Sequence, residues 1–526
     1  MNNIKILDCT LRDGGYINDW NFGNKVIKRI LKNLVDAHID IIECGFLSDC
    51  DYHPDKTIFN DVSQISSIIP QGTGKYVAMV ALGEKEISYD KIPKCDGLSI
   101  FGIRLTFHKH EIERAFEYAK NLMEKGYEVF IQPVGTCTYS DLELLKLVEC
   151  VNELKPYAFY IVDTLGTITG KELMRLFQMI DNNLEQCIRI GFHSHNNLQL
   201  AFANAQELMQ TFTHREILID ASVQGMGRGA GNLCIELITQ FMNENLDTEY
   251  NVTALLEIID KYLVQIKETN PWGYTIPYYI SAVNGCHPNY ATYLINKQTI
   301  NVRDIEKIIT DIPKEKRPLY DKELISSLYK KYMGAQIDDT VALEKLKKIW
   351  KDKSILVLAP GRTVTSEKDK IYSYIKEHNP YIVSINFSDD NYLEDMVFIS
   401  NLKRFDEFEQ VEFANIKKLV VISSNIQTVE NENILKVNYL SYLNSDKFVF
   451  DDAGLMFLNL MKKCNIKQVA LAGFDGFLNK KVYFSNEAGL SMEPLSPIEK
   501  TNRIKMQIQE LRKNMQITFI TTSQYD

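Results

Sequence analysis

Two histidines separated by one residue, His193 and His195, could bind one metal ion together. They follow residues 188–192, an apolar run typical of a buried strand. Residues two apart in a strand point to the same face, so both imidazoles project together. With Asp13 as a carboxylate from another strand, they would form a set that suits octahedral divalent metals with open positions. Spacing alone favours equally two histidines hydrogen-bonded in a polar rim.

Apolar, β-branched runs recur through the first 225 residues, with helix-sized segments between them. They are residues 4–9, 41–46, 75–82, 98–105, 128–133, 159–162, 188–192 and 217–223. Such a series predicts an α/β fold, a (β/α)8 TIM barrel, with an open doubly wound sheet as the alternative. A barrel places its active site at the carboxyl ends of the strands. Polar side chains gather at those ends: Asp8, Arg12, Asp13, Glu43, Arg104, Asp163, Thr164, His193 and His195.

Four motifs occur in order along this half of the chain. They are LDCTLRDG at 7–14, IECGF at 42–46, GFHSHNNL at 191–198 and GMGRGAGN at 225–232. Together they resemble the pyruvate-utilising TIM-barrel metal enzymes, also called the hydroxymethylglutaryl-CoA lyase-like or DRE-TIM metallolyase family. The resemblance covers roughly residues 1–290 and is nearest to the 4-hydroxy-2-oxovalerate aldolase-like members.

The resemblance implies a site that forms the enolate of a 2-oxo acid. Asp13, His193 and His195 would bind Mn²⁺ or Mg²⁺, which polarises the keto group of pyruvate. Arg12 would add fixed positive charge where negative charge grows, with a rim salt bridge to Asp163 as its alternative role. The complete set of predicted residues is catalytic Arg12, Tyr16, Glu43 and Tyr278, substrate-binding Arg104, Asp163, Thr164 and Asn232, and metal-binding Asp13, His193 and His195.

The sequence departs from the family pattern directly after Asp13. The condensing members read D-G-E-Q there, and the aldolases carry a histidine three residues after the aspartate, whereas this chain reads Asp13-Gly-Gly-Tyr16. A phenol is a poor general base at neutral pH, but it can donate a proton or a hydrogen bond. The base could instead be a metal-bound water, His108 or His287. Tyr278 could equally pack a helical subdomain against the barrel.

The rest of the chain predicts two further pieces, so the expected domains are a catalytic barrel at 1–289, a helical bridge at 290–350 and a Rossmann-like α/β domain at 351–526. The bridge has three helical segments that start near Asp304, Asp321 and Asp339, which are candidate N-caps. In the related aldolases, such a region docks a partner dehydrogenase. The last domain has alternating strands and helices and resembles nucleotide- or sugar-nucleotide-binding modules, but a scaffolding role is the alternative.

Composition narrows the function classes. The 526 residues carry a formal net charge of −10, which argues against a general nucleic-acid binder. We find neither a signal-peptide pattern nor an apolar run of membrane-spanning length, and the ten cysteines are scattered, so we expect a cytoplasmic protein. Separately, we expect it to form a homo-oligomer. The predicted function is a metal-dependent lyase or aldolase acting through a metal-bound pyruvate enolate on an aldehyde. An acyl-CoA-dependent synthase and a non-catalytic binding protein on a degenerate barrel are the alternatives.

Overall fold

The protein forms two compact units. The computed structural model describes residues 3–526 except 71, 73, 298, 335, 390, 413–417, 429–430, 447 and 478–495. The first unit comprises Met1–Pro288 and Arg317–Leu319, and the second comprises Asn289–Lys316 and Tyr320–Asp526. The helices expected as a bridge therefore belong to the same unit as the α/β domain that follows them.

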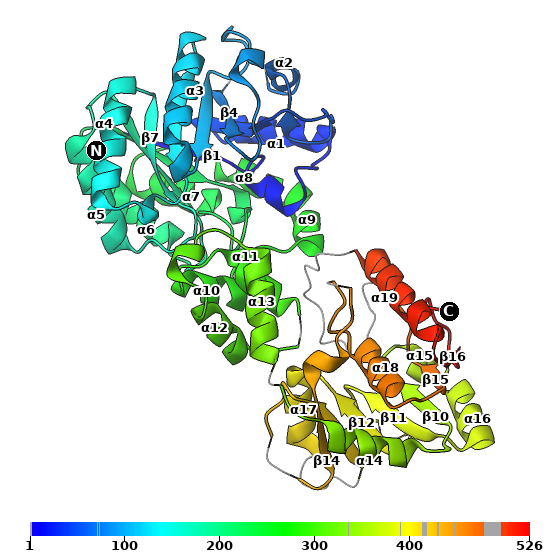
Figure 1. Ribbon diagram of the computed structural model, residues 1–526. Helices are drawn as coiled ribbons and strands as arrows, with labels where there is room; N and C mark the ends of the chain where they lie inside the picture. The colour runs from blue at the N-terminus through cyan, green and yellow to red at the C-terminus, as the bar shows by residue number, and fades with distance from the viewer. Residues whose placement is uncertain are drawn as a thin grey trace. The chain divides into compact units, whose positions relative to one another are not determined.

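The first unit contains a closed parallel barrel (Figure 1), which confirms the expected TIM barrel. Its strands are β1 (Asn3–Asp8), β2 (Ile41–Leu47), β4 (Tyr76–Ala81), β5 (Gly102–Phe107), β6 (Glu128–Pro133), β7 (Ala158–Asp163), β8 (Arg189–Ser194) and β9 (Glu216–Ala221). Each strand pairs with the next, and β1 pairs with both β2 and β9, which closes the ring. A two-residue strand, β3 (Ile58–Phe59), adds to β2 and was not expected.

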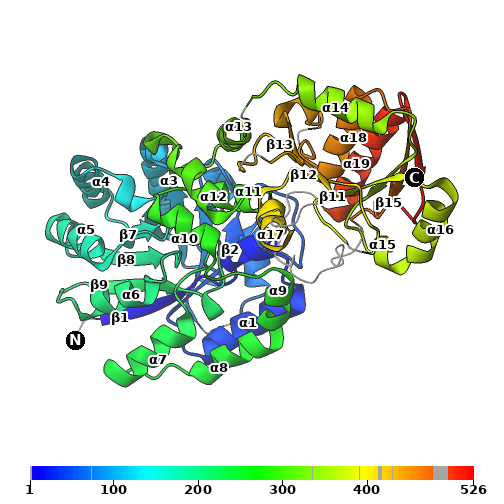
Figure 2. The ribbon, with the colours of Figure 1, turned by 90° about the horizontal axis from the view of Figure 1, so that it is seen from below.

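Helices surround this barrel, and α1 and α8 lie side by side outside it (Figure 2). The helices of the first unit are α1 (Asn24–Asp36), α2 (Val62–Ser66), α3 (Ile112–Glu124), α4 (Asp141–Leu154), α5 (Gly170–Asn183), α6 (Ala201–Gln210), α7 (Ile235–Asn245), α8 (Val252–Ile258), α9 (Val264–Thr269) and α10 (Ile276–Val283).

Alternation along each strand explains why the barrel strands are apolar throughout. On β1, Ile6 joins the large cluster formed with the surrounding helices, whereas Leu7 joins a smaller cluster with Val77 and Phe130. Both faces are therefore buried, as expected for parallel strands covered by helices. The same alternation places a few polar side chains inside the barrel, among them the fully buried Arg104.

The second unit is built on a parallel sheet with the strand order β14-β13-β12-β11-β10-β15-β16. These strands are β10 (Ile355–Leu358), β11 (Tyr381–Ile385), β12 (Met396–Ile399), β13 (Leu419–Ser423), β14 (Ile434–Val437), β15 (Gln468–Ala472) and β16 (Gln516–Phe519). The expected parallel α/β domain is thus confirmed. The two short strands β14 and β16 were missed because Lys436, Gln516 and Thr518 interrupt their apolar character.

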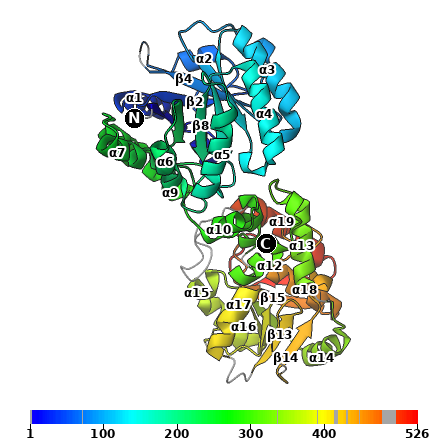
Figure 3. The ribbon, with the colours of Figure 1, turned by 90° about the vertical axis from the view of Figure 1, so that its left-hand side faces the viewer.

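Helices precede and flank this sheet (Figure 3). They are α11 (Pro288–Ile295), α12 (Val302–Thr310), α13 (Lys322–Met333), α14 (Thr340–Trp350), α15 (Thr363–Ser366), α16 (Lys368–His378), α17 (Leu402–Glu412), α18 (Ala453–Lys463) and α19 (Pro497–Arg512). Within this unit, α17 packs on β12 and α18 packs on β11.

The predicted N-caps differ in what their side chains do. The carboxylate of Asp321 accepts from the backbone N–H groups of Glu323 and Leu324 and caps α13 as expected. Asp304 is not the cap of α12, because Asn301 takes that place and Asp304 closes the capping box. Asp339 precedes α14, but its carboxylate instead accepts from Asn438 N and the Tyr442 hydroxyl.

Every helix among the described residues is too short or too polar to cross a bilayer. All ten cysteines are free thiols.

Candidate functional site

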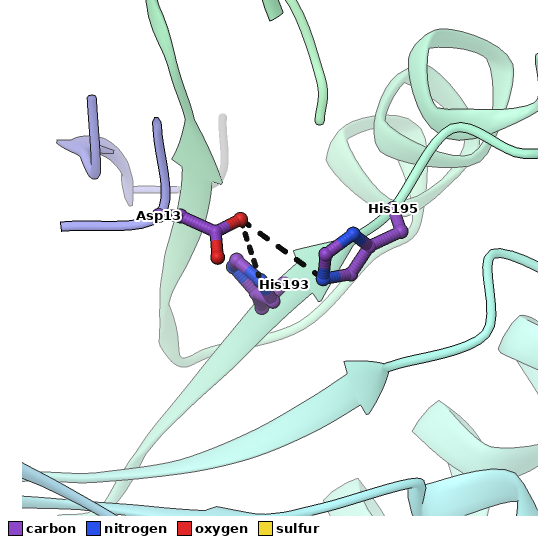
Figure 4. Close-up of side chains that lie close together, drawn as sticks. All are labelled: Asp13, His193 and His195. Atoms are coloured by element: carbon purple, nitrogen blue, oxygen red, sulfur yellow. Dashed lines mark ion pairs between the residues drawn. The ribbon is translucent and has the colours of Figure 1, made fainter. Parts of the chain in front are cut away.

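The barrel brings Asp13, His193 and His195 together (Figure 4). Asp13 lies in the loop that leaves β1, whereas His193 is on β8 and His195 directly follows that strand. An oxygen of Asp13, Oδ2, lies 3.8 Å from His193 Nε2 and 4.0 Å from His195 Nε2. The three candidate ligand atoms all lie within 4.8 Å of one another, a spacing at which one ion could bridge them. The same-face prediction for the two histidines agrees with this arrangement.

The remaining ring nitrogens hold both imidazoles in this orientation. His193 Nδ1 lies 2.9 Å from Asp220 Oδ2, and His195 Nδ1 lies 3.4 Å from the carbonyl oxygen of Arg228. Both Nε2 atoms are therefore directed at Asp13. Metal-binding histidines in proteins commonly use the second nitrogen in this way, with a carboxylate or a backbone carbonyl as partner.

The electrostatics fit a divalent cation. Burial, partly opposed by Asp13, lowers the pKa of His195 to about 4, so this imidazole is neutral at pH 7. Burial would raise the pKa of Asp13, but Arg12 and the two histidines hold it well below its usual range. A carboxylate and a neutral imidazole are the protonation states that metal binding requires. Asn232 donates to Asp13 Oδ2 at 2.5 Å, and its own buried Oδ1 finds no hydrogen-bond partner among the described residues.

Arg12 is fixed beside this cluster by two carboxylates. Its Nε donates to Glu43 Oε2 at 2.8 Å, and its Nη1 donates to Asp13 Oδ1 at 2.8 Å. The Arg12 side chain is buried, and Asp163, the alternative partner considered from the sequence, is not among its ion pairs. The guanidinium therefore stands next to the candidate metal ligands with its position set by Glu43.

Arg104 extends this arrangement into a closed circuit. It donates from Nη1 to Glu43 Oε2 at 2.7 Å and from Nη2 to Asp220, while its guanidinium lies 5.1 Å from the centroid of the Tyr160 ring. Asp220 in turn bonds to His193. Arg104 lies within β5 and not, as expected from the sequence, at its carboxyl end. These contacts favour a positioning role for Arg104, and direct substrate binding by this residue stays a prediction.

The circuit runs through Arg12, Glu43, Arg104, Asp220, His193 and Asp13. It contains two guanidinium groups and three carboxylates, so its formal charge is −1 when the histidine is neutral. A buried excess of negative charge is costly unless a cation balances it. Asp220 was not singled out from the sequence, although it is the only charged residue after Glu216 in the otherwise apolar strand β9.

Asp163 and Thr164 lie at the same rim but hold loop backbone. The carboxylate of Asp163 accepts from Thr167 N at 2.9 Å and Ile168 N at 3.1 Å. The hydroxyl of Thr164 accepts from Gly135 N at 2.9 Å. Substrate binding by these two residues therefore stays a prediction.

Tyr16, which replaces the family histidine, packs in an aromatic and cationic setting. Its ring centroid lies 4.7 Å from that of Trp20, and the guanidinium of Arg228 and the ammonium of Lys85 lie 4.3 and 5.4 Å from it. Burial raises the pKa of Tyr16, so the hydroxyl is protonated at neutral pH. Tyr278 lies on α10, and its catalytic role stays a prediction.

Other titratable groups face this rim. His108 Nε2 lies 3.5 Å from Glu84 Oε1, and this contact raises the pKa of His108. Burial, assisted by the charge of Arg228, lowers the pKa of His287 to about 4, and the charge of His195 acts on it as well. His108 and His287, the two alternative bases considered from the sequence, are therefore both influenced by charged groups at this rim. Lys85 and Glu84 were not singled out because lone charged residues in loops carry no pattern, and Arg228 was quoted only as part of the motif at 225–232.

In the glycine-rich loop after β9, two glycines stand where a larger side chain would clash with atoms near Asp13. A Cβ on Gly227 would lie 2.4 Å from Asn232 Nδ2 and 3.1 Å from Asp13 Oδ2. Gly231 has φ +84°, and a Cβ there would lie 2.0 Å from the carbonyl oxygen of Gly225. The loop thus brings its backbone and Asn232 against Asp13.

Comparisons with known proteins find relatives of the part of the chain that forms the barrel. Residues 3–261 match the family model described as HMGL-like. The chain is 25% identical over 241 residues to oxaloacetate decarboxylase of Mycobacterium tuberculosis, covering 44% of this chain and 68% of that protein. It is 23% identical over 329 residues to 4-hydroxy-2-oxovalerate aldolase of Bacillus thuringiensis, covering 60% and 91%.

It is also similar to 2-isopropylmalate synthase of Oceanobacillus iheyensis, with 27% identity over 250 residues. That match covers 45% of this chain and 47% of the synthase, so the chain spans about half of that relative.

The circuit predicts that metal affinity depends on Asp220, a residue that does not face the ion itself. In Asp220→Asn, His193 loses its carboxylate partner, and Mn²⁺ should bind about 10- to 100-fold more weakly, as measured by calorimetric titration. Asp247→Asn, at an exposed loop residue, is the matched control and should leave the affinity unchanged. Equal Mn²⁺ affinity in Asp220→Asn and the parent protein would contradict the positioning role of Asp220.

Proposed function

We propose, from the premise that residues 3–261 belong to the HMGL-like family, that this chain is a divalent-metal-dependent carbon–carbon lyase. It would make or break a bond at the methyl carbon of pyruvate or a related 2-oxo acid, through the enolate of that acid. The observation that carries the proposal is the grouping of Asp13, His193 and His195 around a common point, with Arg12 bonded to Asp13 at 2.8 Å.

The donor set fits Mn²⁺ or Mg²⁺, held by Asp13, His193 and His195. When bound, such an ion supplies Lewis-acid polarisation of a 2-oxo acid that chelates it. Arg12 places a permanent positive charge beside the same position, where it stabilises the oxygen of the developing enolate. Glu43 and Arg104 keep that guanidinium from rotating away, so little reorganisation is needed when charge develops.

The proton route is proposed to involve Tyr16 as a donor. Its raised pKa leaves the hydroxyl protonated, so Tyr16 can give a proton or a hydrogen bond to the oxygen of an aldehyde substrate. Burial lowers the pKa of His287 to about 4, so that imidazole is neutral at pH 7 and can accept a hydrogen bond, but it is a weak base. Tyr16 as the donor and His287 as an acceptor could therefore orient the reacting groups of an aldol reaction.

An aldehyde is the proposed second substrate, as in the 4-hydroxy-2-oxovalerate aldolases. The sequence lacks the Glu-Gln pair of the acyl-CoA-condensing members, which argues against a synthase of the isopropylmalate type. Decarboxylation of oxaloacetate, the reaction named for another relative, passes through the same enolate and would use the same residues. A non-catalytic binding barrel is disfavoured. Burying the charged guanidinium of Arg12 beside the candidate metal ligands costs free energy of folding, and a barrel without catalysis does not need this arrangement.

Exchange of the methyl protons of pyruvate in D₂O tests enolate formation without naming the electrophile. The full chain with Mn²⁺ should exchange them, as followed by proton NMR. Arg12→Ala should slow this exchange about 10²- to 10³-fold, the usual cost of losing one group that stabilises an oxyanion. The exposed Arg29→Ala is the matched control and should exchange normally. Undiminished exchange in both Arg12→Ala and His193→Ala would refute the site.

Tyr16→Phe separates proton donation from enolate formation. The variant keeps the ring that packs against Trp20 and Arg228, so the fold should be unaffected. Cleavage of a 4-hydroxy-2-oxo acid should fall about 10²- to 10⁴-fold, whereas pyruvate exchange should persist. Tyr52→Phe, at a half-buried tyrosine outside the described site, is the control. Full cleavage activity in Tyr16→Phe would assign the proton transfer to another group such as His287 or His108.

The cations over Tyr16 predict a preference for aldehydes that carry a negative charge. Arg228 and Lys85 both contact the Tyr16 ring. In Arg228→Ala, the ratio of kcat/KM for an aldehyde bearing a carboxylate to that for a neutral aldehyde should fall about tenfold, the effect of one charge-assisted hydrogen bond. Arg29→Ala should leave the ratio unchanged. If the ratio is also unchanged in Arg228→Ala, these cations do not select the electrophile.

A further inference from the structure

The sheet of the second unit reverses its strand order at β10. From β10 the chain adds β11, β12, β13 and β14 on one side and then returns to add β15 and β16 on the other. β10 and β15 are neighbours in the sheet, but the chain continues from β10 to one side and from β15 to the other, so the loops that leave them run apart. In open parallel α/β sheets, ligands bind outside the carboxyl ends of the strands at such a switch point.

A cavity of about 1440 Å³ lies at this point, and all of its lining residues belong to the second unit. Its wall includes Pro360 and Gly361 after β10 and the segment 473–477 after β15. Asn386 and Ser400, which follow β11 and β12, line it as well. Pockets for drug-sized ligands usually measure about 300–1,000 Å³, so this cavity can hold a ligand of nucleotide size or larger.

The two switch-point loops are fixed to each other. The carboxylate of Asp475, after β15, accepts from Thr363 N at 3.0 Å and from the hydroxyl of Thr363, after β10. A Cβ on Gly361 would lie 2.1 Å from the carbonyl oxygen of Gly473, so only glycine allows this approach. The wall at the switch point is thus preformed.

Positive charge gathers on another part of the same wall. The ammonium groups of Lys297 and Lys330 lie 4.0 and 5.0 Å from the centroid of the Phe450 ring, so two cations share one aromatic side chain. The charges of Lys330 and Lys500 both act on Lys297 and, after burial, help to lower its pKa. Three lysines that repel one another at one cavity wall mark a place suited to an anion.

Two carboxylates beside these lysines, Asp451 and Asp452, already have partners within the protein. Asp451 Oδ1 lies 3.6 Å from Lys297 Nζ, and Asp451 Oδ2 accepts from the Tyr329 hydroxyl at 3.0 Å. Asp452 caps α18 by accepting from Leu455 N at 3.0 Å. Within the part of the chain that the structure describes, no carboxylate lies in ion-pair distance of Lys330. Among the described residues, Lys330 therefore contributes a positive charge to the wall that no carboxylate pairs with.

We propose that this cavity is a second ligand site, separate from the barrel chemistry, that binds a nucleoside diphosphate, free or as part of a larger activated molecule. Its phosphates would contact Lys297, Lys330 and Lys500, and its organic part would lie along the switch-point loops. Lysine ammonium groups are suited to phosphate oxygens, and a preformed wall of glycine backbone allows close approach of a ligand. The proposal does not depend on the reaction proposed for the barrel.

Calorimetric titration of the full chain with UDP and with ADP tests the proposal. The buffer contains EDTA, so a diphosphate cannot be held by an ion in the barrel. At least one probe should bind at one site per chain, inorganic pyrophosphate should compete with it, and uridine or adenosine should bind far more weakly. Added salt should weaken the binding, because the phosphates meet lysines. No binding of either probe at millimolar concentration would overturn the proposal, as would nucleoside binding as tight as that of the diphosphate.

A matched pair of charge reversals locates the site. Lys330→Glu should weaken binding at least tenfold, since an attractive contact becomes repulsive. Lys345→Glu, on the exposed face of α14 outside the cavity, should change the affinity less than twofold. Both lysines are exposed, so both variants should melt at the temperature of the parent protein. Equal affinity in Lys330→Glu and Lys345→Glu would overturn the assignment to this cavity.

Discussion

The closed circuit of buried charges inside the barrel is the constraint on which the candidate site depends. Arg12, Glu43, Arg104, Asp220, His193 and Asp13 each contact the next member, and all six are almost fully buried. Breaking one pair in such a setting leaves an uncompensated charge, at a cost of about 3–5 kcal/mol. The position of each group is therefore determined by its two neighbours. The gap between Asp13 and the two histidines suits a divalent cation because a carboxylate and two imidazoles are the kinds of ligand that such ions bind.

Barrel closure makes the circuit possible. The six residues come from β1, β2, β5, β8 and β9 or the loops that follow them. Arg12 and Asp220, the two that are farthest apart along the chain, are separated by 208 residues. Both faces of the parallel strands bury apolar side chains. The free energy gained by this burial offsets the free energy that is lost when the six polar groups leave water. The glycine-rich loop after β9 then lies close enough for Asn232 to bond to Asp13, and it carries Arg228 over the Tyr16 ring.

Much of this organisation is visible in the sequence, and its limits have physical causes. The eight barrel strands are recognisable because they are apolar and β-branched, whereas β14 and β16 are short and partly polar. The candidate metal ligands are recognisable because His193 and His195, two apart in a strand, share one face and also lie in a motif that resembles the family. Asp220 carries no such signal, because a single carboxylate in an apolar strand shows its role only when the barrel places it beside Arg104. Asp163 shares the rim with the metal set, but its oxygens bind the backbone of its own loop, a difference that spacing does not reveal.

In the proposed site, the circuit holds Asp13, His193 and His195 ready for one divalent cation beside Arg12. A crystal of the full chain grown with Mn²⁺ and measured at the manganese absorption edge tests this most directly. One strong anomalous peak is expected in the barrel, at about 2.0–2.3 Å from an oxygen of Asp13 and from both Nε2 atoms. An anomalous peak elsewhere in the barrel, or none despite Mn²⁺ in excess, would contradict it.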